Sequence, residues 1–530
     1  MGEAGKHEKK LDDYIQMGWY VVYVCIAAEL MILTHVNSQF YMMFAGAAPK
    51  ITGCDGKFFG AELHDKELCI VYRETANCSQ FDMSYQFRSV NVEWGYYCNQ
   101  AKTVKNSISI QMFGVLVGSV VFGQLSDSFG RKNSMLLTMF GMMSGWLMVG
   151  FAKDLTHFTV TRTLVGFFTG GSISVVNIFI LENIPKHLRM WISMAITWSP
   201  NMPLMAFIAW YFPEWNNYAV ANAFICVPAI LFCGIFIHES PRWLVSRGKV
   251  HEAREVIRNQ LKTSGQLDLM DDEFENVLLT EYKRAMEVNA KQRQYSYYHL
   301  FSTWNLALVT TVLAFSYFST SIINYGILFN MEKLSGSIYW NSVYTGLMRY
   351  ACNIGFGILD LKFKCIGRKF IHTSGLVLML LSLGFVVFAY YFDLEITLKE
   401  EVRVAILLAS SMTSQVYIAD GIVGSELFPT PIRNIGYSWL QMWNRFGVVV
   451  SPFILYLQDW WVALPYCVMI LFTSIDTVAF ECCLPETKGK PLIEHMPRKE
   501  ERIFSKRKNR TPLVDTLVDQ KKLEEASNLQ

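Results

Sequence analysis

Charged residues are scarce in this 530-residue chain. Asp, Glu, Lys and Arg make up 17% of it, whereas a soluble domain usually carries about 25%. The deficit comes from long uncharged stretches, which are typical of membrane-spanning segments. Neither sign of charge dominates, because the formal net charge is +2. The composition therefore gives no reason to expect nucleic acid or an acidic macromolecule as a partner.

The sequence also lacks the short motifs of common catalytic sites. It contains no Cys-x-x-Cys pair, no phosphate-binding P-loop and no His-Glu-x-x-His run, so we expect no enzyme activity, metal or cofactor. No cleavable signal peptide is expected, because residues 1–16 are polar and the first apolar run is longer than a signal core.

Long apolar runs predict twelve membrane-spanning helices. The expected spans are residues 18–44, 104–125, 134–151, 158–181, 191–212, 218–237, 304–328, 339–361, 370–392, 402–417, 435–457 and 463–483. The tenth run is short because Asp420 and Glu426 follow it. We therefore predict an all-α membrane protein with six-helix halves at 18–237 and 303–483, a cytoplasmic N-terminus at 1–17 and a cytoplasmic tail at 484–530.

Basic residues set the expected orientation. Arg131, Lys132, Lys186, Arg189 and Arg433 all fall on one side under a twelve-span count, whereas the short loops on the opposite side lack Lys and Arg. Because basic loops stay in the cytoplasm, both termini are expected there. The loop 45–105 is then extracellular, and the linker 238–302 between the halves is cytoplasmic.

The extracellular loop carries four cysteines, Cys54, Cys69, Cys78 and Cys98. In an oxidising compartment they predict two disulfides, with three pairings that the sequence leaves open. Asn77 lies in a sequon for N-glycosylation. The linker and the tail show charge patterns of solvated helices and loops, and the basic run 506–510 is compatible either with anionic membrane lipid as a partner or with a solvated tail.

Similar signatures occur at equivalent places in the two halves. Residues 123–132 (GQLSDSFGRK) follow the second span and 366–369 (IGRK) the eighth, while 182–189 follow the fourth and 426–433 the tenth. This recurrence indicates an internal repeat. Acid–base pairs in such loops can join neighbouring helix ends by charge-assisted hydrogen bonds and so act as gates. The residues expected in these gating contacts are Asp127, Arg131, Glu182, Arg189, Glu239, Arg242, Arg368, Glu426 and Arg433.

These features resemble the major facilitator superfamily, and more narrowly its organic cation, organic anion and carnitine transporters. The narrower resemblance rests on the cysteine-bearing loop and on residues 238–244 (HESPRWL), 426–434 (ELFPTPIRN) and 484–489 (LPETKG). Sugar porters of the same superfamily share versions of the first and last of these runs. The resemblance covers residues 17 to about 492. It implies a multi-pass carrier of the plasma membrane that works by alternating access.

One departure from the family pattern is Lys364, which stands where the family usually has an Asp before the glycine of the second-half motif. Asp360 lies four residues earlier and could take its place. The gating contact of the second half is therefore expected to be weaker or built differently.

Two arginines within the spans carry the expectation about substrate. A guanidinium at membrane depth is costly and normally faces a polar cavity or a carboxylate. By resemblance, cation carriers have an Asp at the position of Arg445, whereas anion and carnitine carriers have an Arg. Arg349 lies near a place where cation carriers have a Glu. Both could bind an organic anion with the planar guanidinium fork, or each could belong to a structural ion pair.

Glu29 and His35 in the first span are the other polar groups of interest. Glu29 could neutralise Arg445 or Arg349, or either residue could couple transport to a proton; a simple polar contact within the bundle is the alternative. Asp476 is expected near the end of its helix or in a local pair. The further candidates for substrate binding are Tyr317, Phe318, Asn324, Tyr325 and Trp198.

The sequence thus favours a transporter of small organic ions that prefers organic anions. A carrier of a carnitine-like zwitterion or of organic cations is the alternative within the same class, and a receptor-like or scaffold membrane protein without turnover is the alternative outside it. The expected partners are a small organic ion, membrane lipid and either a counter-ion or an exchanged substrate.

Overall fold

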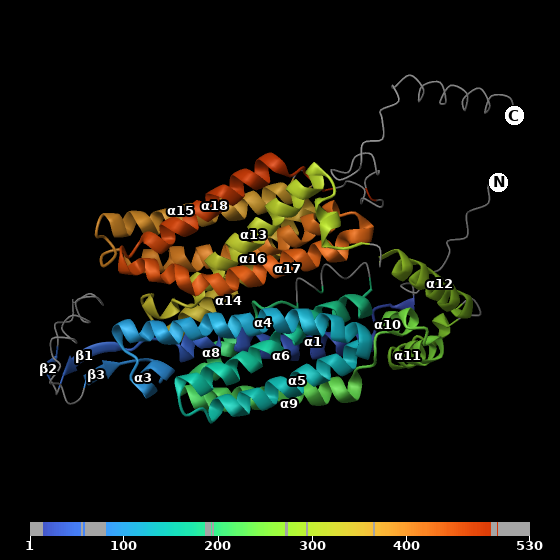
Figure 1. Cartoon of the computed structure of the whole chain (residues 1–530), viewed down its shortest axis with the longest axis horizontal. Helices are drawn as coiled ribbons and strands as arrows, with labels where there is room; N and C mark the ends of the chain where they lie inside the picture. Colours follow the sequence, from blue (N-terminus) through green and yellow to red (C-terminus); the bar gives the residue numbers. More distant parts are fainter. Residues whose placement is uncertain are drawn as a thin grey trace, which may run out of the picture.

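The computed structural model describes residues 14–54, 57–58, 81–185, 192, 196–270, 274–292, 295–363, 366–488 and 496. The residues Cys69, Cys78, Asn77, Arg189 and Lys364 lie outside these ranges. Two bundles of long helices form the body of the molecule, one above the other in Figure 1. Each bundle comes from one half of the sequence, as the internal repeat predicts.

The first bundle is built from six helices. They are α1 (Trp19–Ala45), α4 (Ala101–Phe129), α5 (Arg131–Gly150), α6 (Leu155–Asn183), α8 (Asn201–Tyr211) and α9 (Trp215–Phe236). Glycines allow α4 and α6 to approach closely: a Cβ at Gly118 would lie 1.8 Å from the carbonyl oxygen of Phe167, and one at Gly170 would lie 2.0 Å from that of Val115. Small residues at helix contacts are typical of membrane bundles, where close packing holds helices together.

The second bundle has the same number of long helices. They are α13 (Trp304–Leu328), α14 (Ile338–Lys362), α15 (Arg368–Tyr391), α16 (Lys399–Leu427), α17 (Arg433–Ile454) and α18 (Leu464–Cys483). Among the described residues, eight helices are long and apolar enough to cross a membrane by themselves. Of the other four, α5, α14 and α17 are less apolar and the described α8 has only 11 residues, so their places in the bundles identify them as spans.

The structure corrects one expected span and describes only part of another. The tenth was expected at 402–417, yet α16 continues to Leu427 because Asp420 is fully buried beside His372 and Glu426 approaches Arg368 in the last turn. The charges that seemed to end the span are therefore partnered within the bundle. The fifth was expected at 191–212, and its described helix, α8, covers Asn201–Tyr211; residues 186–191 and 193–195 lie outside the described part.

Small elements cap the two ends of the bundles. At one end a three-stranded antiparallel sheet, β1 (Lys50–Cys54), β2 (Lys57–Phe58) and β3 (Phe81–Ser84), has the order β2-β1-β3. After β3 the chain continues into α3 (Val90–Trp94) and the short helix η2 (Cys98–Gln100). We call this the sheet end. The purely helical class predicted for the whole chain thus holds for the membrane body, whereas the loop after α1 contains strands.

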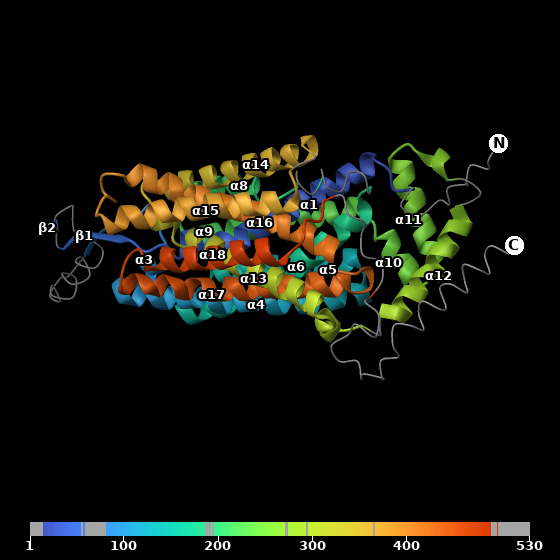
Figure 2. The ribbon, with the colours of Figure 1, turned by 90° about the horizontal axis from the view of Figure 1, so that it is seen from above.

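At the opposite end the linker between the halves folds into helices, and we call this the linker end. They are α10 (Pro241–Ser246), α11 (Val250–Thr263), η3 (Leu267–Leu269), α12 (Phe274–Gln292) and η4 (Tyr297–Phe301). Figure 2 shows α10, α11 and α12 beyond the ends of the long helices, far from β1 and β2. An apolar cluster that includes Leu244, Ile257 and Leu278 holds α10, α11 and α12 together.

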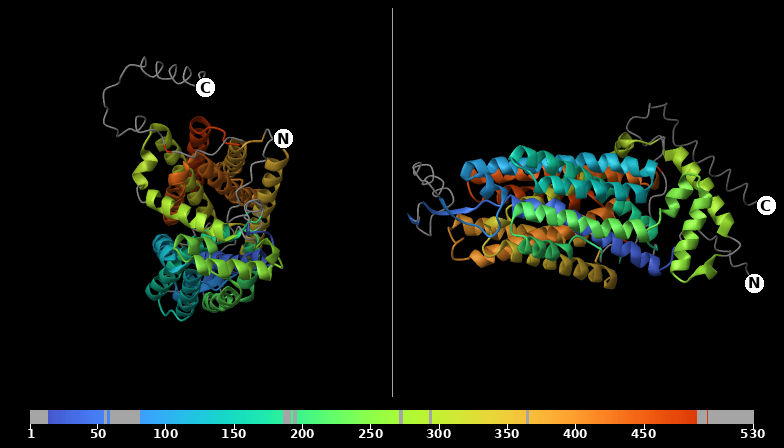
Figure 3. Two further views of the ribbon diagram at one scale, coloured as in Figure 1. Left: turned by 90° about the vertical axis from the view of Figure 1, so that its right-hand side faces the viewer. Right: turned by 90° about the horizontal axis from the view of Figure 1, so that it is seen from below.

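The two halves meet where α4 contacts α17 and where α8 contacts α14. Ser109 on α4 donates to the carbonyl oxygen of Val449 on α17 at 2.9 Å. Three short helices complete the second half: η5 (Met331–Lys333), η6 (Thr430–Ile432) and η7 (Leu455–Asp459). The end-on view in Figure 3 shows the halves as separate helix groups with the linker helices across one end.

Candidate functional site

Arg349 lies at the middle of α14 and faces the interior of the second half. Its side chain is buried, and its Nη2 atom donates to Asn324 Oδ1 at 2.5 Å and to Thr413 Oγ1 at 2.7 Å. Nη1 lies 3.9 Å from the sulfur of Met202 on α8 of the other half, while Nε is buried and has no hydrogen-bond partner. A buried donor without a partner is costly, and here it lies at the junction of the halves.

Arg445 lies near the middle of α17 and is also buried, with 9% of its surface exposed. Its charge lies close enough to Tyr325 on α13 and to His35 on α1 to interact with both electrostatically. The neighbouring Asn444 accepts a hydrogen bond from Ser321. Within the described part of the chain, neither Arg445 nor Arg349 forms an ion pair with a carboxylate. The site therefore has two buried positive charges that no protein acid within ion-pair distance neutralises.

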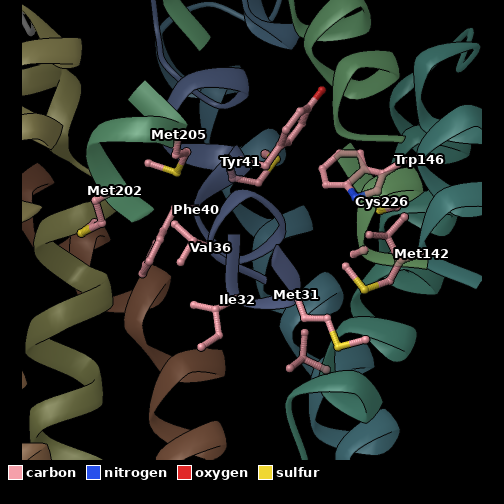
Figure 4. Close-up of a cluster of buried hydrophobic side chains, with 14 of the residues drawn as sticks. Met31, Ile32, Val36, Phe40, Tyr41, Met142, Trp146, Met202, Met205 and Cys226 are labelled. Atoms are coloured by element: carbon pink, nitrogen blue, oxygen red, sulfur yellow. The ribbon is translucent and has the colours of Figure 1, made fainter. Parts of the chain in front are cut away.

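Aromatic rings from both halves lie beside these arginines. Phe40 on α1 stacks on Tyr325 with centroids 5.7 Å apart and meets Trp198 edge-on at 6.1 Å. Figure 4 shows Phe40 on the side of α1 that faces Met202, while Tyr41 points to the opposite side, toward Trp146. Of the predicted site residues, Arg349, Asn324, Arg445, Tyr325 and Trp198 are thus gathered around one junction, with Phe40 as a member that the sequence did not single out.

The two remaining predicted aromatics lie elsewhere. Tyr317 is buried with its ring 5.9 Å from that of Tyr417. Phe318 stacks on Phe446 at 5.7 Å, and Phe446 is 46% exposed. Phe318 also contacts Trp443 on α17 and Phe472 on α18, so it packs with these rings rather than with Phe40 and Tyr325.

Glu29 and His35 do not form ion pairs with the arginines. Glu29 accepts a hydrogen bond from Asn201 at 2.8 Å, and its second oxygen is buried without a partner. His35 is buried and its Nε2 lies 2.8 Å from the hydroxyl of Ser172 on α6. The pairing of Glu29 with Arg445 or Arg349 is therefore not present in this conformation.

Sequence reasoning overlooked a third buried arginine, Arg162 on α6. It donates to Gln111 Oε1 at 3.3 Å and to the carbonyl oxygen of Ser38 at 2.8 Å. Its guanidinium also lies 4.8 Å from the ring of Tyr41 and 4.6 Å from that of Trp146, within the range of cation–π contacts. Its position inside the apolar run 158–181 could have identified it from the sequence.

The two halves are joined at the sheet end. Lys105 at the start of α4 donates to Asn330 Oδ1 at 2.9 Å and forms an ion pair with Glu332 at 3.2 Å. Gln86 accepts from the backbone N–H of Ile338 at 2.8 Å and, through its carbonyl oxygen, from the hydroxyl of Tyr339 at 2.9 Å. These contacts cross from one half to the other and close the sheet end above the junction.

At the linker end, each half has its own network of charges. In the first half, Arg131 pairs with Asp127 at 2.6 Å and with Glu182 at 3.2 Å. Glu239 accepts from the backbone N–H groups of Arg131 at 2.8 Å and Lys132 at 3.2 Å, at the first turn of α5. A carboxylate at a helix N-terminus accepts hydrogen bonds from the free N–H groups and interacts favourably with the positive end of the helix dipole. The loop therefore joins α4, α5, α6 and the linker.

The glycine between α4 and α5 makes this arrangement possible. Gly130 has φ +101°, and a Cβ there would lie 2.3 Å from Glu239 Oε2. Other residues rarely adopt this φ, and a side chain would displace the carboxylate. The glycine of the GRK run is thus required for both the turn and the carboxylate contact.

The second half repeats the arrangement with different residues. Glu486 accepts from the backbone N–H groups of Arg368 at 3.0 Å and Lys369 at 3.1 Å, at the first turn of α15. Asp360 forms ion pairs with Arg368 and, at 3.1 Å, with Lys488. Asp360 therefore supplies the acid that Lys364 cannot supply. The gating contact of the second half is thus built differently from the family pattern, which was one of the two expectations. Glu486 thus accepts hydrogen bonds at the start of α15 as Glu239 does at the start of α5.

Burial by itself would raise the pKa of Glu486, but the N–H groups of Lys488, Lys369 and Arg368 more than offset it and lower the pKa. In the linker, burial lowers the pKa of Arg242, and the charge of Glu281 partly offsets this shift. Arg433 donates to the carbonyl oxygen of Phe428 at 3.3 Å. These three groups lie at the linker end.

Of the cysteines expected in disulfides, Cys98 is disulfide-bonded. Cys54 ends β1, and the other two lie outside the described residues. The pairing therefore stays open, as it was from the sequence. The cysteines described as free all belong to the membrane helices.

Comparison with known proteins identifies the family. Residues 70–498 match the family model described as "Sugar (and other) transporter". The "Organic cation transporter protein" of Drosophila melanogaster is 27% identical over 431 residues, which cover 79% of this chain and 76% of that protein. The human "Organic cation/carnitine transporter 2" is 28% identical, with 78% and 72% covered. "Solute carrier family 22 member 7" of Rattus norvegicus is 26% identical, with 79% and 77% covered.

Solved structures agree on the fold. The inward open conformation of the xylose transporter XylE from E. coli superposes with a TM-score of 0.62 at 15% identity, over 89% of this chain and 98% of that one. The partially occluded inward open conformation of the same transporter gives a TM-score of 0.59. At this identity the likeness shows the fold alone.

Fold and comparisons together define a multi-pass membrane transporter of the major facilitator superfamily and not an enzyme. The chain belongs to the sugar (and other) transporter family, in the group of the organic cation, organic anion and carnitine transporters. The predictions of family, fold and transport of small organic molecules are thereby confirmed.

Proposed function

We propose that this transporter prefers small organic anions and binds them with Arg349 and Arg445. The observation that carries the proposal is the burial of both guanidiniums, at 6% and 9% exposure, without an ion pair among the described residues. Two buried cations create a positive potential that attracts an anion. A bound carboxylate or sulfonate would supply the counter-charge that the protein does not.

The geometry suggests how the anion would be bound. Nη2 of Arg349 is already engaged by Asn324 and Thr413, which fixes the orientation of the guanidinium plane. Its Nε atom has no partner and remains able to donate. A guanidinium held in this way can donate its Nε–H to a carboxylate or sulfonate at little further cost in entropy.

The aromatic rings at the junction would bind the apolar part of the substrate. Phe40 and Tyr325 come from opposite halves and stack on each other, so a flat substrate could replace one ring contact as the halves move. Aromatic surfaces accept apolar bodies of different shapes with little specific hydrogen bonding. This favours a range of organic anions over one particular substrate.

We further propose that the linker end lies in the cytoplasm and the sheet end outside, at the plasma membrane. The distribution of basic residues supports this orientation, and a disulfide at Cys98 suits an oxidising exterior. With the sheet end joined by Lys105 and Gln86, this conformation would face inward. Each linker-end network, around Arg131 or Arg368, lies within one half and its adjoining segments. The networks would act as gates by fixing the helix ends of each half, which separate from those of the other half when the linker end opens.

A carnitine-like zwitterion is the second candidate. It is favoured by one observation, the Phe40–Tyr325 stack beside Arg445, because aromatic faces attract quaternary ammonium groups while an arginine binds the carboxylate. Exchange against a second solute, or coupling to an ion, would drive net transport in either case.

Uptake into cells that express the chain tests the preference. Radiolabelled benzoate, benzenesulfonate, carnitine and tetraethylammonium would be compared at equal surface expression, with empty-vector cells as the background. We expect saturable uptake of the two anions and little uptake of tetraethylammonium. Saturable tetraethylammonium uptake without uptake of either anion would refute the proposal. Carnitine uptake without benzenesulfonate uptake would select the zwitterion.

A further inference from the structure

Three titratable side chains form a fully buried cluster in the second half, away from the arginines. His372 on α15, Asp420 on α16 and Asp476 on α18 each have 0% exposed surface. Ser316 and Ser319 on α13 complete what we call the acid–histidine cluster. Figure 1 shows that these four helices all belong to the upper bundle. Asp476, expected near its helix end or in a local pair, instead bonds to residues more than 150 positions away.

The Ser316 hydroxyl lies at the centre of the cluster. Its oxygen is 2.7 Å from an oxygen of Asp420 and 3.0 Å from an oxygen of Asp476. It is also 3.2 Å from Nε2 of His372, which lies 3.1 Å from the other oxygen of Asp420. Ser319 lies 3.0 Å from the same oxygen of Asp476. The second oxygen of Asp476 and Nδ1 of His372 are buried without hydrogen-bond partners.

The contacts of Ser316 favour a proton on one of the two carboxyl groups. A serine hydroxyl carries a single hydrogen, so Ser316 can donate to Asp420 or to Asp476 but not to both. A hydrogen on the carboxyl group would turn the other oxygen–oxygen contact into a hydrogen bond as well. One consistent arrangement has Ser316 donating to an ionised Asp420, and a protonated Asp476 donating to Ser316. Two ionised carboxylates sharing one buried hydroxyl would also repel each other.

The groups that face the cluster do not supply a fixed positive charge. Tyr317 from α13 lies close enough to Asp420 to interact with it electrostatically, and Tyr417 from α16 and Tyr437 from α17 interact with Tyr317 in turn. Glu481 from α18 lies on the side of His372. Lys369 at the start of α15 is paired with Glu481 at 3.1 Å. Among the described residues there is no group of His, Cys, Asp and Glu suited to a metal ion, so a proton is the ligand that fits.

We propose that the acid–histidine cluster is a proton-binding site whose proton moves together with the transported anion. This inference rests on the proposed transport of anions. Uptake of one proton by the cluster balances the charge of one anion at the arginines. The loaded carrier therefore has the same net charge as the empty carrier.

The surroundings of the cluster provide a route for the proton at the linker end. His372 lies in the second turn of α15, about 6 Å along the axis from the helix start. Its neighbour Thr373 donates to Glu481 at 2.5 Å, and the Glu481 side chain is 39% exposed. Glu481 could therefore exchange protons with water and pass them toward His372 when the helices α15 and α18 loosen.

Two helices connect the cluster to the substrate junction. Ser316 and Ser319 belong to α13, which also carries Asn324 and Tyr325. Asp420 lies one turn beyond Tyr417 on α16, and the Tyr417 hydroxyl is 2.8 Å from that of Ser321. A change of protonation that alters the hydrogen bonds of Ser316 therefore acts on a helix that bears substrate contacts.

Transport by the purified full-length chain in liposomes tests the inference. Benzenesulfonate is the probe because it stays ionised and does not cross lipid as a neutral acid. An inward gradient of one pH unit is expected to raise its accumulation up to about tenfold in the wild type, the limit for one coupled proton. Asp476→Asn should abolish this stimulation yet retain counterflow of labelled against unlabelled benzenesulfonate at equal pH. Glu401→Gln, an exposed acid at the far end of α16, serves as the control and should behave as the wild type.

Full stimulation in an Asp420→Asn/Asp476→Asn double variant, or wild-type uptake that ignores the pH gradient, would overturn the inference. Absence of both uptake and counterflow in the wild type would instead count against the proposed transport of this anion. Infrared titration of the purified chain then decides the proton site without any substrate. We expect a protonated-carboxyl carbonyl band in the wild type that is diminished in Asp476→Asn and unchanged in Glu401→Gln; a band unaltered by Asp476→Asn would refute the site.

Discussion

Replacing Arg349 by methionine separates an anion-binding role from a structural one. Methionine has a similar length and no charge, so the variant removes the guanidinium while filling much of its space. The Thr413 hydroxyl lies 2.6 Å from the carbonyl oxygen of Ser410 and 3.1 Å from Asn324 Oδ1, so it can turn its one hydrogen to Asn324 when the guanidinium is gone. The local packing of α13, α14 and α16 should survive, and the change should fall mainly on substrate binding.

The expected size follows from the hydrogen bonds that an anion would lose. A hydrogen bond to a charged group contributes about 1.5–3 kcal/mol, and about 1.4 kcal/mol corresponds to a factor of ten. Vmax/KM for benzenesulfonate should therefore fall about ten- to hundredfold, mostly through KM. Arg349→Lys keeps the charge and loses the planar fork, so an intermediate loss is expected.

Initial rates of uptake at several concentrations, normalised to surface-labelled protein, would measure the effect. Arg254→Met is the matched control, because Arg254 belongs to the linker helix α11 and half of its side chain is exposed. It should leave Vmax/KM unchanged. A well-expressed Arg349→Met transporter with wild-type KM for benzenesulfonate would refute the reasoning.

Three further changes test other parts of the structure. Asp127→Asn weakens the pair with Arg131 at the linker end, so turnover should fall several-fold with KM unchanged in uptake assays; a raised KM at normal turnover would contradict a gating role. Glu486→Gln should lower the thermal stability of the purified chain by about 1 kcal/mol at pH 7. Because the pKa of Glu486 is lowered in the folded state, its stabilisation is complete above the ordinary carboxyl pKa of about 4.3 and is lost as the pH falls through the lower folded value. The two melting curves should therefore converge below about pH 4, and a constant difference would be inconsistent with this origin. Gly118→Val places methyl groups against the carbonyl of Phe167, where even a Cβ would lie 1.8 Å away, so surface expression should collapse; normal expression and melting would show that α4 and α6 can separate.

The sequence by itself determined the class of protein and most of the membrane helices. Long apolar runs have few alternatives to helices in lipid, because every backbone polar group must be satisfied within the span. The repeated GRK motifs also located the linker-end networks. The glycine of the motif is required there because it makes room for a carboxylate, as Gly130 does for Glu239. Arg349 and Arg445 stood out because charge inside an apolar run is costly.

The tertiary structure decided which of these groups meet. Sequence spacing on one helix cannot tell which neighbouring helix a side chain faces, so Phe318 was a candidate beside Tyr325 although its ring packs against Phe446 and Trp443 of α17. Asp420 seemed to end a span, and its burial beside His372 appears when α15 and α16 pack together. Contacts between residues far apart in the chain depend on helix packing, and helix packing alone brought His372, Asp420 and Asp476 to one hydroxyl of α13.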